Sequence, residues 1–335
     1  MPCLRPGPRL GVVTGSPASI DLPAAVRSAE ARARPHLLTT PVVPAAGLSA
    51  ELGSPVVLKC ENLQHTGSFK ARGALSKLLS LDAGELDRGV ITASTGNHGA
   101  AVAYAGTIVG VEPVVVVPEG ANPSKLAAIE RLGGRVEVLG TDSVESEIGA
   151  RRLAQEGSLT FVSPYNDLAV IGGQGTLGLE LLEQVRDLAA VFVAVGGGGL
   201  ASGVAGIIKA VAPRTAIIGC SPAASAVMYH SLRAGHVLEL PSEPTLSDGT
   251  AGGVEQGAIT FGILEALLDD FVTVEEDDIR RAFLDLIEVE HQLVEGSAAM
   301  AYSAARAHAT RVSGTTAVIL CGGNVGTQNL RGILA

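Results

Sequence analysis

The sequence predicts an α/β fold with two lobes, each built on a parallel β-sheet, and three observations support this prediction. First, 335 residues exceed the length at which a single hydrophobic core usually stops growing. Second, hydrophobic residues make up 47% of the chain and charged residues 17%, which excludes disorder and is typical of a globule with fully buried strands. Third, short apolar runs alternate with stretches of helical periodicity, and clusters among the 42 glycines follow several of these runs.

The elements are expected in the following order. The first fifteen residues, rich in proline and glycine, are expected to form a flexible arm, and the first helix covers 23–33, with Asp21 and Pro23 suited to its first turn. An extended, proline-bounded segment follows at 40–43. The strands expected after it cover 56–59, 89–93, 113–117, 135–139, 161–162, 191–195, 215–219 and 317–320. The helices between them cover 69–79, 99–108, 124–132, 144–155, 174–185, 200–211 and 224–234.

Charge and composition exclude several classes of protein. The net charge of −10, without any basic run, argues against binding to nucleic acid. Residues 188–208 carry no charge, as a membrane span would, but four central glycines would each cost a helix about 1 kcal/mol relative to alanine. We therefore expect strand, loop and helix there, and no membrane association. The N-terminus does not resemble a signal peptide, and the scattered cysteines favour a reducing cytoplasm over a disulfide framework or a zinc site.

Four consecutive glycines, Gly196, Gly197, Gly198 and Gly199, follow one predicted strand and precede a predicted helix. Such a run exposes several backbone N–H groups at the positive end of the helix, which suits a phosphate group. A tight turn alone would not require four glycines. The loop is neither a Walker loop nor a dinucleotide fingerprint, because the residues that complete those motifs are missing.

Two more loops follow predicted strands. Ser94-Thr95-Gly96-Asn97-His98-Gly99 can hold a carboxylate with hydroxyl groups and backbone amides, and Asn97 can reach the oxygen of a ring. By itself this loop is equally well explained as an N-cap. The loop Cys321-Gly322-Gly323-Asn324 is by itself an ordinary strand end. The three loops together favour a ligand site at the carboxyl ends of the strands.

Lys70 stands next to Phe69 and is followed by apolar residues of a predicted helix. Most helical lysines are solvated, and only burial or a cationic neighbour lowers the pKa enough to make the amine nucleophilic at neutral pH. Pyridoxal 5'-phosphate (PLP), when it is held as a Schiff base, requires three things: a lysine, a loop that binds its phosphate, and a loop with hydroxyl and amide groups. The sequence therefore predicts a PLP-dependent enzyme.

The motifs in their order resemble a known family. Ser-Phe-Lys-Ala-Arg-Gly-Ala at 68–74 is followed by Ser-Thr-Gly-Asn-His-Gly at 94–99, Gly-Gly-Gly-Gly-Leu at 196–200 and Cys-Gly-Gly-Asn at 321–324. This order resembles the fold type II PLP enzymes of the threonine/serine dehydratase and serine racemase group. The resemblance implies a fold like that of the tryptophan synthase β subunit, with the cofactor between a large domain (1–75 and 163–335) and a small inserted domain (76–162).

The resemblance also implies roles for residues. Lys70 would bind the cofactor covalently and then remove the Cα proton of the substrate, with Phe69 behind the cofactor. Asn97 would contact the 3-oxygen of the ring, Cys321 would face the pyridine nitrogen, and the amides from Gly196 to Leu200 would hold the phosphate. Ser94, Thr95, Asn97 and His98 would surround the substrate carboxylate. Loss of the β-hydroxyl as water would then yield a 2-oxo acid and ammonia.

Three features distinguish this chain within that group. Residues 220–227 contain no carboxylate where serine racemases hold a divalent cation, so no metal is expected. Thr95 stands where racemases use a serine as the acid/base on the opposite face and dehydratases tend to have alanine. The segment 247–255 is glycine-rich where relatives have larger residues near the substrate. The 94–99 loop and the metal-free segment are also similar to dehydratases of hydroxyectoine breakdown.

The leading hypothesis is therefore a cytoplasmic, homodimeric dehydratase (ammonia-lyase) for a small β-hydroxy amino acid such as L-threonine or L-serine. The alternatives are a dehydratase for 3-hydroxyaspartate or for a hydroxyectoine-derived amino acid, and an amino-acid racemase. A non-catalytic protein that binds PLP for storage or regulation is a hypothesis of a different class.

Overall fold

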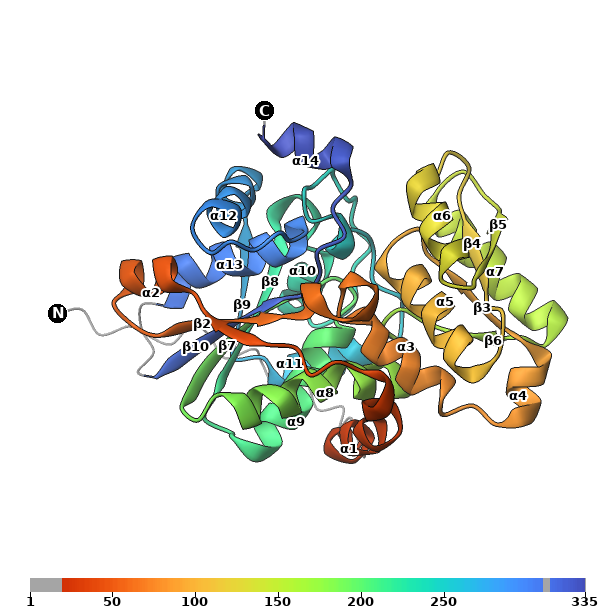
Figure 1. Ribbon diagram of the computed structural model, residues 1–335, viewed down its shortest axis with the longest axis horizontal. Helices are drawn as coiled ribbons and strands as arrows, with labels where there is room; N and C mark the ends of the chain where they lie inside the picture. Colours follow the sequence, from red (N-terminus) through yellow and green to blue (C-terminus); the bar gives the residue numbers. More distant parts are fainter. Residues whose placement is uncertain (1–19, 310–313, 335) are drawn as a thin grey trace.

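The computed structural model describes residues 20–309 and 314–334, and the predicted N-terminal arm lies outside them. The chain forms two lobes around separate sheets, with α3 between them (Figure 1). The strands are β1 Val42–Pro44, β2 Val56–Cys60, β3 Val90–Ala93, β4 Val114–Val117, β5 Arg135–Val138, β6 Thr160–Phe161, β7 Leu188–Ala194, β8 Ala216–Pro222, β9 Asp270–Val274 and β10 Thr315–Leu320. The helices are α1 Leu22–Ala33, α2 Ala46–Leu52, α3 Lys70–Leu78, α4 Ala83–Arg88, α5 Asn97–Val109, α6 Pro123–Arg131, α7 Ser143–Gly157, α8 Leu168–Gln184, α9 Gly199–Val211, α10 Val227–Ala234, α11 Ile259–Leu267, α12 Glu276–Glu288, α13 Gly296–His308 and α14 Thr327–Leu334.

The larger sheet has six strands in the order β1-β2-β10-β7-β8-β9, and all neighbours are parallel except β1 and β2. The helices α8 and α9 lie on one side of this sheet, with α12 and α13 on the other (Figure 1). Strands covered on both faces need apolar side chains throughout, which explains why β7 and β10 are almost continuously hydrophobic. The predicted α/β class with parallel sheets is confirmed.

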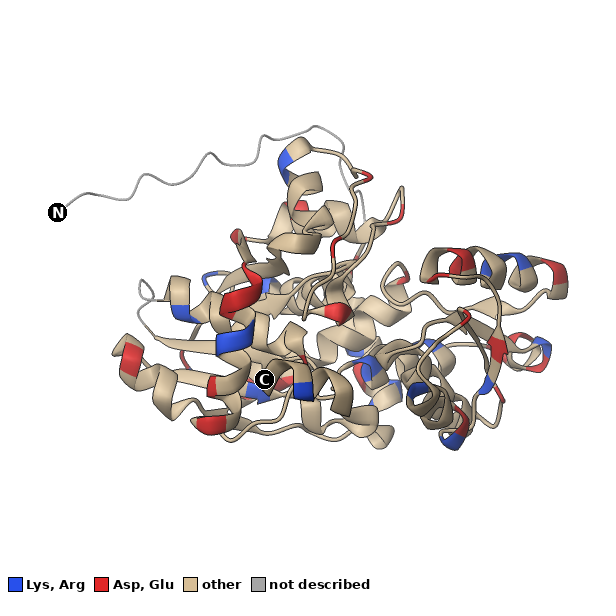
Figure 2. Cartoon of the chain, turned by 90° about the horizontal axis from the view of Figure 1, so that it is seen from above, with Lys and Arg blue, Asp and Glu red and all other residues tan. Residues whose placement is uncertain are grey.

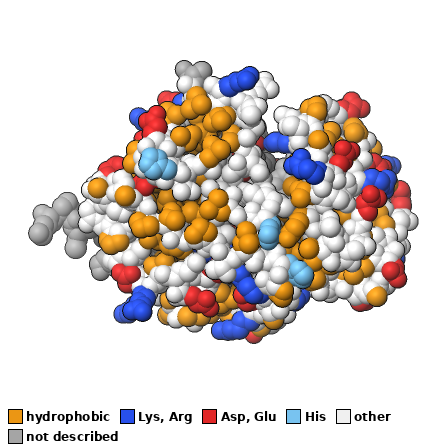
Figure 3. Space-filling view, viewed as in Figure 1, with side chains coloured by type: hydrophobic (Ala, Val, Ile, Leu, Met, Phe, Trp, Pro, Cys, Tyr) orange, Lys and Arg blue, Asp and Glu red, His pale blue; other side chains and the backbone are white. Residues whose placement is uncertain are grey.

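The smaller sheet is wholly parallel, in the order β5-β4-β3-β6, and it is formed entirely by residues between α3 and α8. The helices α4 to α7 accompany it at the right of Figure 1. Basic and acidic residues are interspersed on the helices of both lobes (Figure 2). The surface is indented between the two lobes (Figure 3).

Each strand predicted from 56–59 onward overlaps an observed strand, so the predicted β-α alternation is confirmed up to residue 234. The segment 188–208 is β7, a loop and the beginning of α9, as expected. No helix among the described residues is long and apolar enough to cross a membrane. The prediction missed the elements that lie between residue 234 and the last strand, namely α11, β9, α12 and α13, and also the short helices α2, α4 and α14.

The helix α8 begins at Leu168, six residues before the predicted start. Its first turns contain Gly172, Gly173 and Gly175, which have low helix propensity and therefore concealed it. The structure shows why glycine is needed: a Cβ on Gly175 would lie 2.3 Å from Cγ2 of Val26 and 2.7 Å from the carbonyl oxygen of Gly203. Close packing of α8 against α1, α3 and α9 thus outweighs local propensity, and it anchors the helix that carries Lys70.

Candidate active site

Lys70 is the first residue of α3 and lies next to the end of β10. The preceding residue, Phe69, donates its backbone N–H to the carbonyl oxygen of Cys321 at 3.0 Å, which ties the start of the helix to the third predicted loop. The partly buried amine of Lys70 donates to the carbonyl oxygen of Pro164 at 3.0 Å. Among the described residues no carboxylate forms an ion pair with it.

Burial lowers the pKa of Lys70 from its usual value of 10.5 to about 8, although the carboxyl group of Glu295 acts in the opposite direction. The neutral fraction of the amine near pH 7 is therefore much larger than for a solvated lysine. A neutral amine is the form that attacks an aldehyde carbon. The apolar surroundings noted in the sequence thus have a direct chemical consequence.

The tetraglycine loop connects β7 to α9. Gly198 caps the helix with φ of +89°, a conformation that side chains other than glycine rarely adopt. Within the described part of the chain, no backbone N–H group from Gly196 to Leu200 donates to another residue. Free N–H groups at the positive end of a helix form an anion site, so this loop fits a phosphate group.

The loop of Pro164 and Tyr165 connects this anion site with Lys70. The carbonyl oxygen of Pro164 accepts from the lysine amine, and the ring of Tyr165 lies so close to Gly197 that an added Cβ would be 2.3 Å from it. The side chain of Tyr165 also accepts a hydrogen bond from the backbone N–H of Glu255 at 2.8 Å. An amine and an anion site therefore lie on two sides of one loop segment.

The second predicted loop, Ser94 to Gly99, runs from β3 into α5. Within the described residues, the backbone N–H groups of Thr95, Asn97 and His98 have no acceptor, so this loop forms another anion site at a helix N-terminus. The ring of His98 does not contribute to this anion site, because its Nε2 contacts the carbonyl oxygen of Val162 at 3.0 Å. Burial, together with nearby Lys70, lowers the pKa of His98 to about 3, so the ring is neutral.

Glu295 is a site residue that the sequence analysis did not identify. It lies between Asn97, whose Nδ2 donates to both carboxylate oxygens at 2.8 and 3.1 Å, and Cys321, whose sulfur is 3.7 Å from Oε1. Burial and the adjacent carboxyl group raise the pKa of Cys321 well above its usual value, so it remains a thiol. The stretch Glu295-Gly296-Ser297-Ala298 also resembles the family, but the residues alone gave this glutamate no role, and only its position in the fold reveals one.

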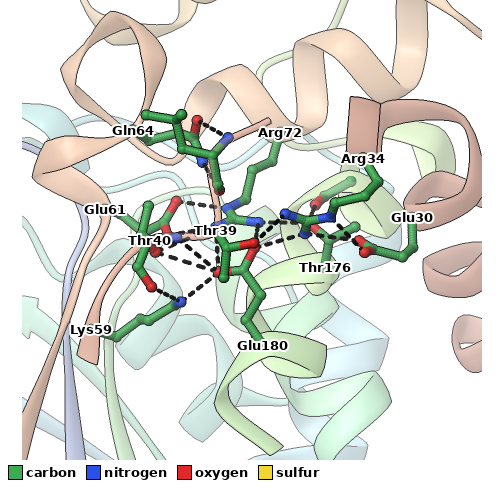
Figure 4. Close-up of polar contacts among 12 residues, drawn as sticks. Glu30, Arg34, Thr39, Thr40, Lys59, Glu61, Gln64, Arg72, Thr176 and Glu180 are labelled. Carbon is green, nitrogen blue, oxygen red and sulfur yellow. Dashed lines mark hydrogen bonds and ion pairs between the residues drawn. The ribbon is translucent and has the colours of Figure 1, made fainter. Parts of the chain in front are cut away.

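A cluster of buried charges surrounds Arg72, two residues after Lys70 on α3, and the sequence analysis did not predict it (Figure 4). Arg72 is fully buried, and its guanidinium contacts Glu61 at 2.7 and 2.8 Å and Glu180 at 2.8 and 3.0 Å. Glu180 also pairs with Lys59 and with Arg34. These residues come from β2, α3, α8 and the turns that follow α1 and β2, so the cluster joins the elements around α3.

The three predicted loops meet around Lys70 at the carboxyl ends of β3, β7 and β10. An amine with a lowered pKa, an amide-lined site for a phosphate and a second one for a carboxylate define an enzyme that binds an aldehyde cofactor with an anionic group. This inventory fits PLP: Lys70 suits the aldehyde and the tetraglycine loop suits the phosphate.

Comparison with known proteins gives the family. The pattern described as "Pyridoxal-phosphate dependent enzyme" matches residues 33–322, so the chain belongs to this family. L-threonine ammonia-lyase of Geobacter sulfurreducens is 38% identical over 92% of this chain and 78% of its own length. Serine racemase of Arabidopsis thaliana is 37% identical over 91% of this chain and 93% of its own. The structure of the processed form of threonine deaminase isoform 2 from Solanum lycopersicum has a TM-score of 0.90 and 34% identity, covering 99% of this chain and 98% of that one. The predicted family resemblance and the cofactor PLP are confirmed.

Proposed function

We propose that this chain is a PLP-dependent ammonia-lyase that converts a small β-hydroxy amino acid, such as L-threonine or L-serine, to a 2-oxo acid and ammonia. One observation carries the proposal: a partly buried lysine with a lowered pKa lies beside two loops whose backbone amides have no acceptor among the described residues. One loop suits the phosphate of the cofactor and the other the carboxylate of an amino acid. The names of the relatives support the reaction class.

The residues that would hold PLP are Phe69, Lys70, Asn97, Cys321 and the amides from Gly196 to Leu200. The bound cofactor supplies an electron sink for the bond electrons released at Cα. Lys70 acts as the base that removes the Cα proton, for which a pKa near the operating pH is favourable. Cys321, as a neutral thiol, supplies no negative charge next to the pyridine nitrogen.

The residues that would bind the substrate are in the second loop. The backbone N–H groups of Thr95, Asn97 and His98 orient the carboxylate, with the hydroxyl groups of Ser94 and Thr95 beside it. His98 contributes its backbone N–H and not its ring, because the ring is neutral and its Nε2 contacts the carbonyl oxygen of Val162. Departure of the β-hydroxyl as water leaves an enamine that hydrolyses to the 2-oxo acid and ammonia.

The assembly and the domains are part of the proposal. The distribution of strands supports a large domain of residues 1–75 and 163–335 and a small domain of residues 76–162, with the cofactor between them. We expect a homodimer in the cytoplasm, acting on a small amino acid without nucleic acid or membrane partners. The cysteines Cys60, Cys220 and Cys321 are free and buried, which is compatible with a reducing compartment. Sedimentation of the holoenzyme tests the dimer.

A second candidate reaction is racemisation, and one observation favours it. The hydroxyl of Thr95 makes no hydrogen bond to the described residues, so it is free to exchange a proton with the substrate. The added methyl group relative to serine restricts that hydroxyl to fewer rotamers.

The test is a panel of substrates. The holoenzyme is incubated separately with L-threonine, L-serine, 3-hydroxyaspartate and a hydroxyectoine-derived amino acid, and 2-oxo acid release is followed together with the chirality of the remaining substrate. Release from L-threonine or L-serine supports the proposal. Production of D-serine without pyruvate would overturn it in favour of the racemase, and no change in any substrate would favour a binding protein.

A further inference from the structure

Glu295 is an unusual buried carboxylate. Glu295 as a whole residue is only 5% exposed. Among the described residues no lysine or arginine forms an ion pair with its carboxylate. Glu61 and Glu180 are equally buried, but both contact the guanidinium of Arg72. Because burying a carboxyl group without a cation costs free energy, its position calls for a functional explanation.

The surroundings of Glu295 come from separate parts of the chain that meet at this carboxyl group. Its oxygens accept from Nδ2 of Asn97, in the loop after β3, and the thiol of Cys321, after β10, lies 3.7 Å from Oε1. The backbone adapts to the carboxylate as well: a Cβ on Gly322 would lie 2.7 Å from Oε1 and 2.8 Å from Oε2. Glycine at 322 thus makes room for this side chain.

The contacts fix which way the Asn97 amide faces. Its Nδ2 donates to Glu295, and its Oδ1 accepts from Nδ2 of Asn324 at 2.8 Å. Rotating the amide by 180° would place Oδ1 against the carboxylate oxygens and Nδ2 against another NH₂ group, which would lose both hydrogen bonds. The two oxygens of one carboxylate lie too close together to accept both divergent N–H bonds, so they share one hydrogen of Nδ2. The second hydrogen remains for another acceptor.

We propose that Glu295 is a positioning residue for the cofactor: it orients the amide of Asn97 so that the remaining Nδ2 hydrogen is presented to the 3-oxygen of PLP. This inference rests on the proposed placement of PLP at Lys70 and Asn97. Glu295 itself does not contact the reacting atoms. Its effect on cofactor binding passes through Asn97.

The experiment compares the PLP dissociation constants of Glu295→Ala, Glu295→Gln, Asn97→Ala and the double variant Glu295→Ala/Asn97→Ala, measured by titrating apoenzyme with PLP. Removing the carboxyl group frees the amide of Asn97 to rotate, and we expect PLP to bind about tenfold to a hundredfold more weakly to Glu295→Ala. Glu295→Gln retains an oxygen that accepts from Asn97, so its dissociation constant stays within about threefold of the parent. In the Asn97→Ala background, Glu295→Ala has no further effect beyond about twofold.

The control is Glu290→Gln. Glu290 is another buried carboxylate of the same lobe, but it accepts from the backbone N–H of Leu48 and from the hydroxyl of Tyr302. We expect this variant to lose thermal stability while its PLP affinity is unchanged. The comparison distinguishes the general effect of altering a buried glutamate from the specific effect of Glu295 on the orientation of Asn97. The visible absorbance maximum of bound PLP should shift in the same direction in Glu295→Ala and Asn97→Ala, because the first variant releases and the second removes the donor to the 3-oxygen.

Two results would overturn the inference: Glu295→Ala binds PLP as tightly as the parent, or the effects of Glu295→Ala and Asn97→Ala multiply in the double variant. If Glu295→Ala does not fold, a dissociation constant for Glu295→Gln that rises as much as that of Asn97→Ala would overturn it equally. All these readouts measure cofactor binding. Failure of the proposed reaction would show instead as normal PLP binding without 2-oxo acid release.

Discussion

Lys70 and Arg72 are two cationic side chains on the same helix, only two positions apart, yet their surroundings differ completely. Arg72 is fully buried and contacts both oxygens of Glu61 and both of Glu180 (Figure 4). Lys70 is partly buried and donates to one neutral acceptor, the carbonyl oxygen of Pro164. Because residues two apart project from different faces of a helix, one cation faces the lobe interior and the other the cofactor loops.

The difference shows that the pKa of a buried cationic side chain depends on the carboxylates in contact with it, and not on burial alone. Burial lowers the pKa of Arg72, but Glu61 and Glu180 outweigh this effect and raise it, so the guanidinium is a permanent charge. Burial also lowers the pKa of Lys70, and there Glu295 compensates only partly, so the pKa falls to about 8. The first cation therefore stabilises the fold, and the second is available for chemistry.

The largest effect is expected from Lys70→Ala. Loss of the amine removes both the covalent attachment point of PLP and the base, so the rate of 2-oxo acid release should fall by about 10³-fold or more. The free energy of unfolding should change little, since the amine has a single neutral partner. The matched control is Lys77→Ala on the same helix, whose side chain pairs with Asp167 at 2.8 Å and should leave activity intact. Activity in Lys70→Ala equal to that of the control would show that the amine is not used.

The reverse pattern is expected for Arg72→Met. Removing the guanidinium leaves Glu61 and Glu180 buried with fewer cationic partners, which should lower the free energy of unfolding by about 3–5 kcal/mol in urea titrations. Arg34→Met is the control, because Arg34 is more exposed, also pairs with Glu30, and leaves Glu180 in contact with Arg72 and Lys59 when it is removed. A loss below about 1 kcal/mol for Arg72→Met would show that the buried cluster does not stabilise the elements around α3.

The pKa of Lys70 can be tested in the apoenzyme by the rate of PLP capture as a function of pH. Only the neutral amine attacks the aldehyde, so the rate should rise about tenfold per pH unit below pH 8 and level off above about pH 8. A rate that still rises between pH 9 and pH 10 would indicate an amine with the usual lysine pKa. That outcome would remove the contrast between the two cations.

The smallest effect is expected where solvent surrounds the charges. Lys125 on α6 pairs with Asp248 across the two lobes at 3.6 Å, with side chains 35% and 54% exposed. Lys125→Gln should change the free energy of unfolding by less than about 1 kcal/mol, because water screens an exposed pair. Urea titration at low and high salt checks this, and a larger loss would mean that exposure is a poor guide to the value of these ion pairs.

Much of the site could be predicted because its signals are local. The glycines at 196–199 follow a β-strand and precede a helix, and their free N–H groups depend only on that short sequence of elements. The apolar context of Lys70 was visible in the same way. The domain boundaries and the roles of individual residues remain predictions.

The missed features have a physical reason as well. The early start of α8 was hidden because its glycines oppose helix formation locally and are required only by packing against α1, α3 and α9. The helix α12 is amphipathic and α13 is buried along most of its length, but neither is preceded by an apolar run and a glycine loop of the kind that marked the earlier strand ends. Glu295 could not be distinguished, because a single glutamate has no periodic or composition signal.

The amino-acid sequence by itself determined the alternation of strands and helices up to residue 234, the three loops at the strand ends and the lysine that follows Phe69, because periodicity, glycine clusters and helix termini are properties of neighbouring residues. The tertiary structure decided which charged groups meet. Arg72 and Glu180 are 108 positions apart and Asn97 and Glu295 are 198 apart, so their contacts exist only once distant parts of the chain have packed together. Burial and neighbouring charges set the pKa of each group. The chemical role of Lys70 and the stabilising role of Arg72 are therefore consequences of that packing.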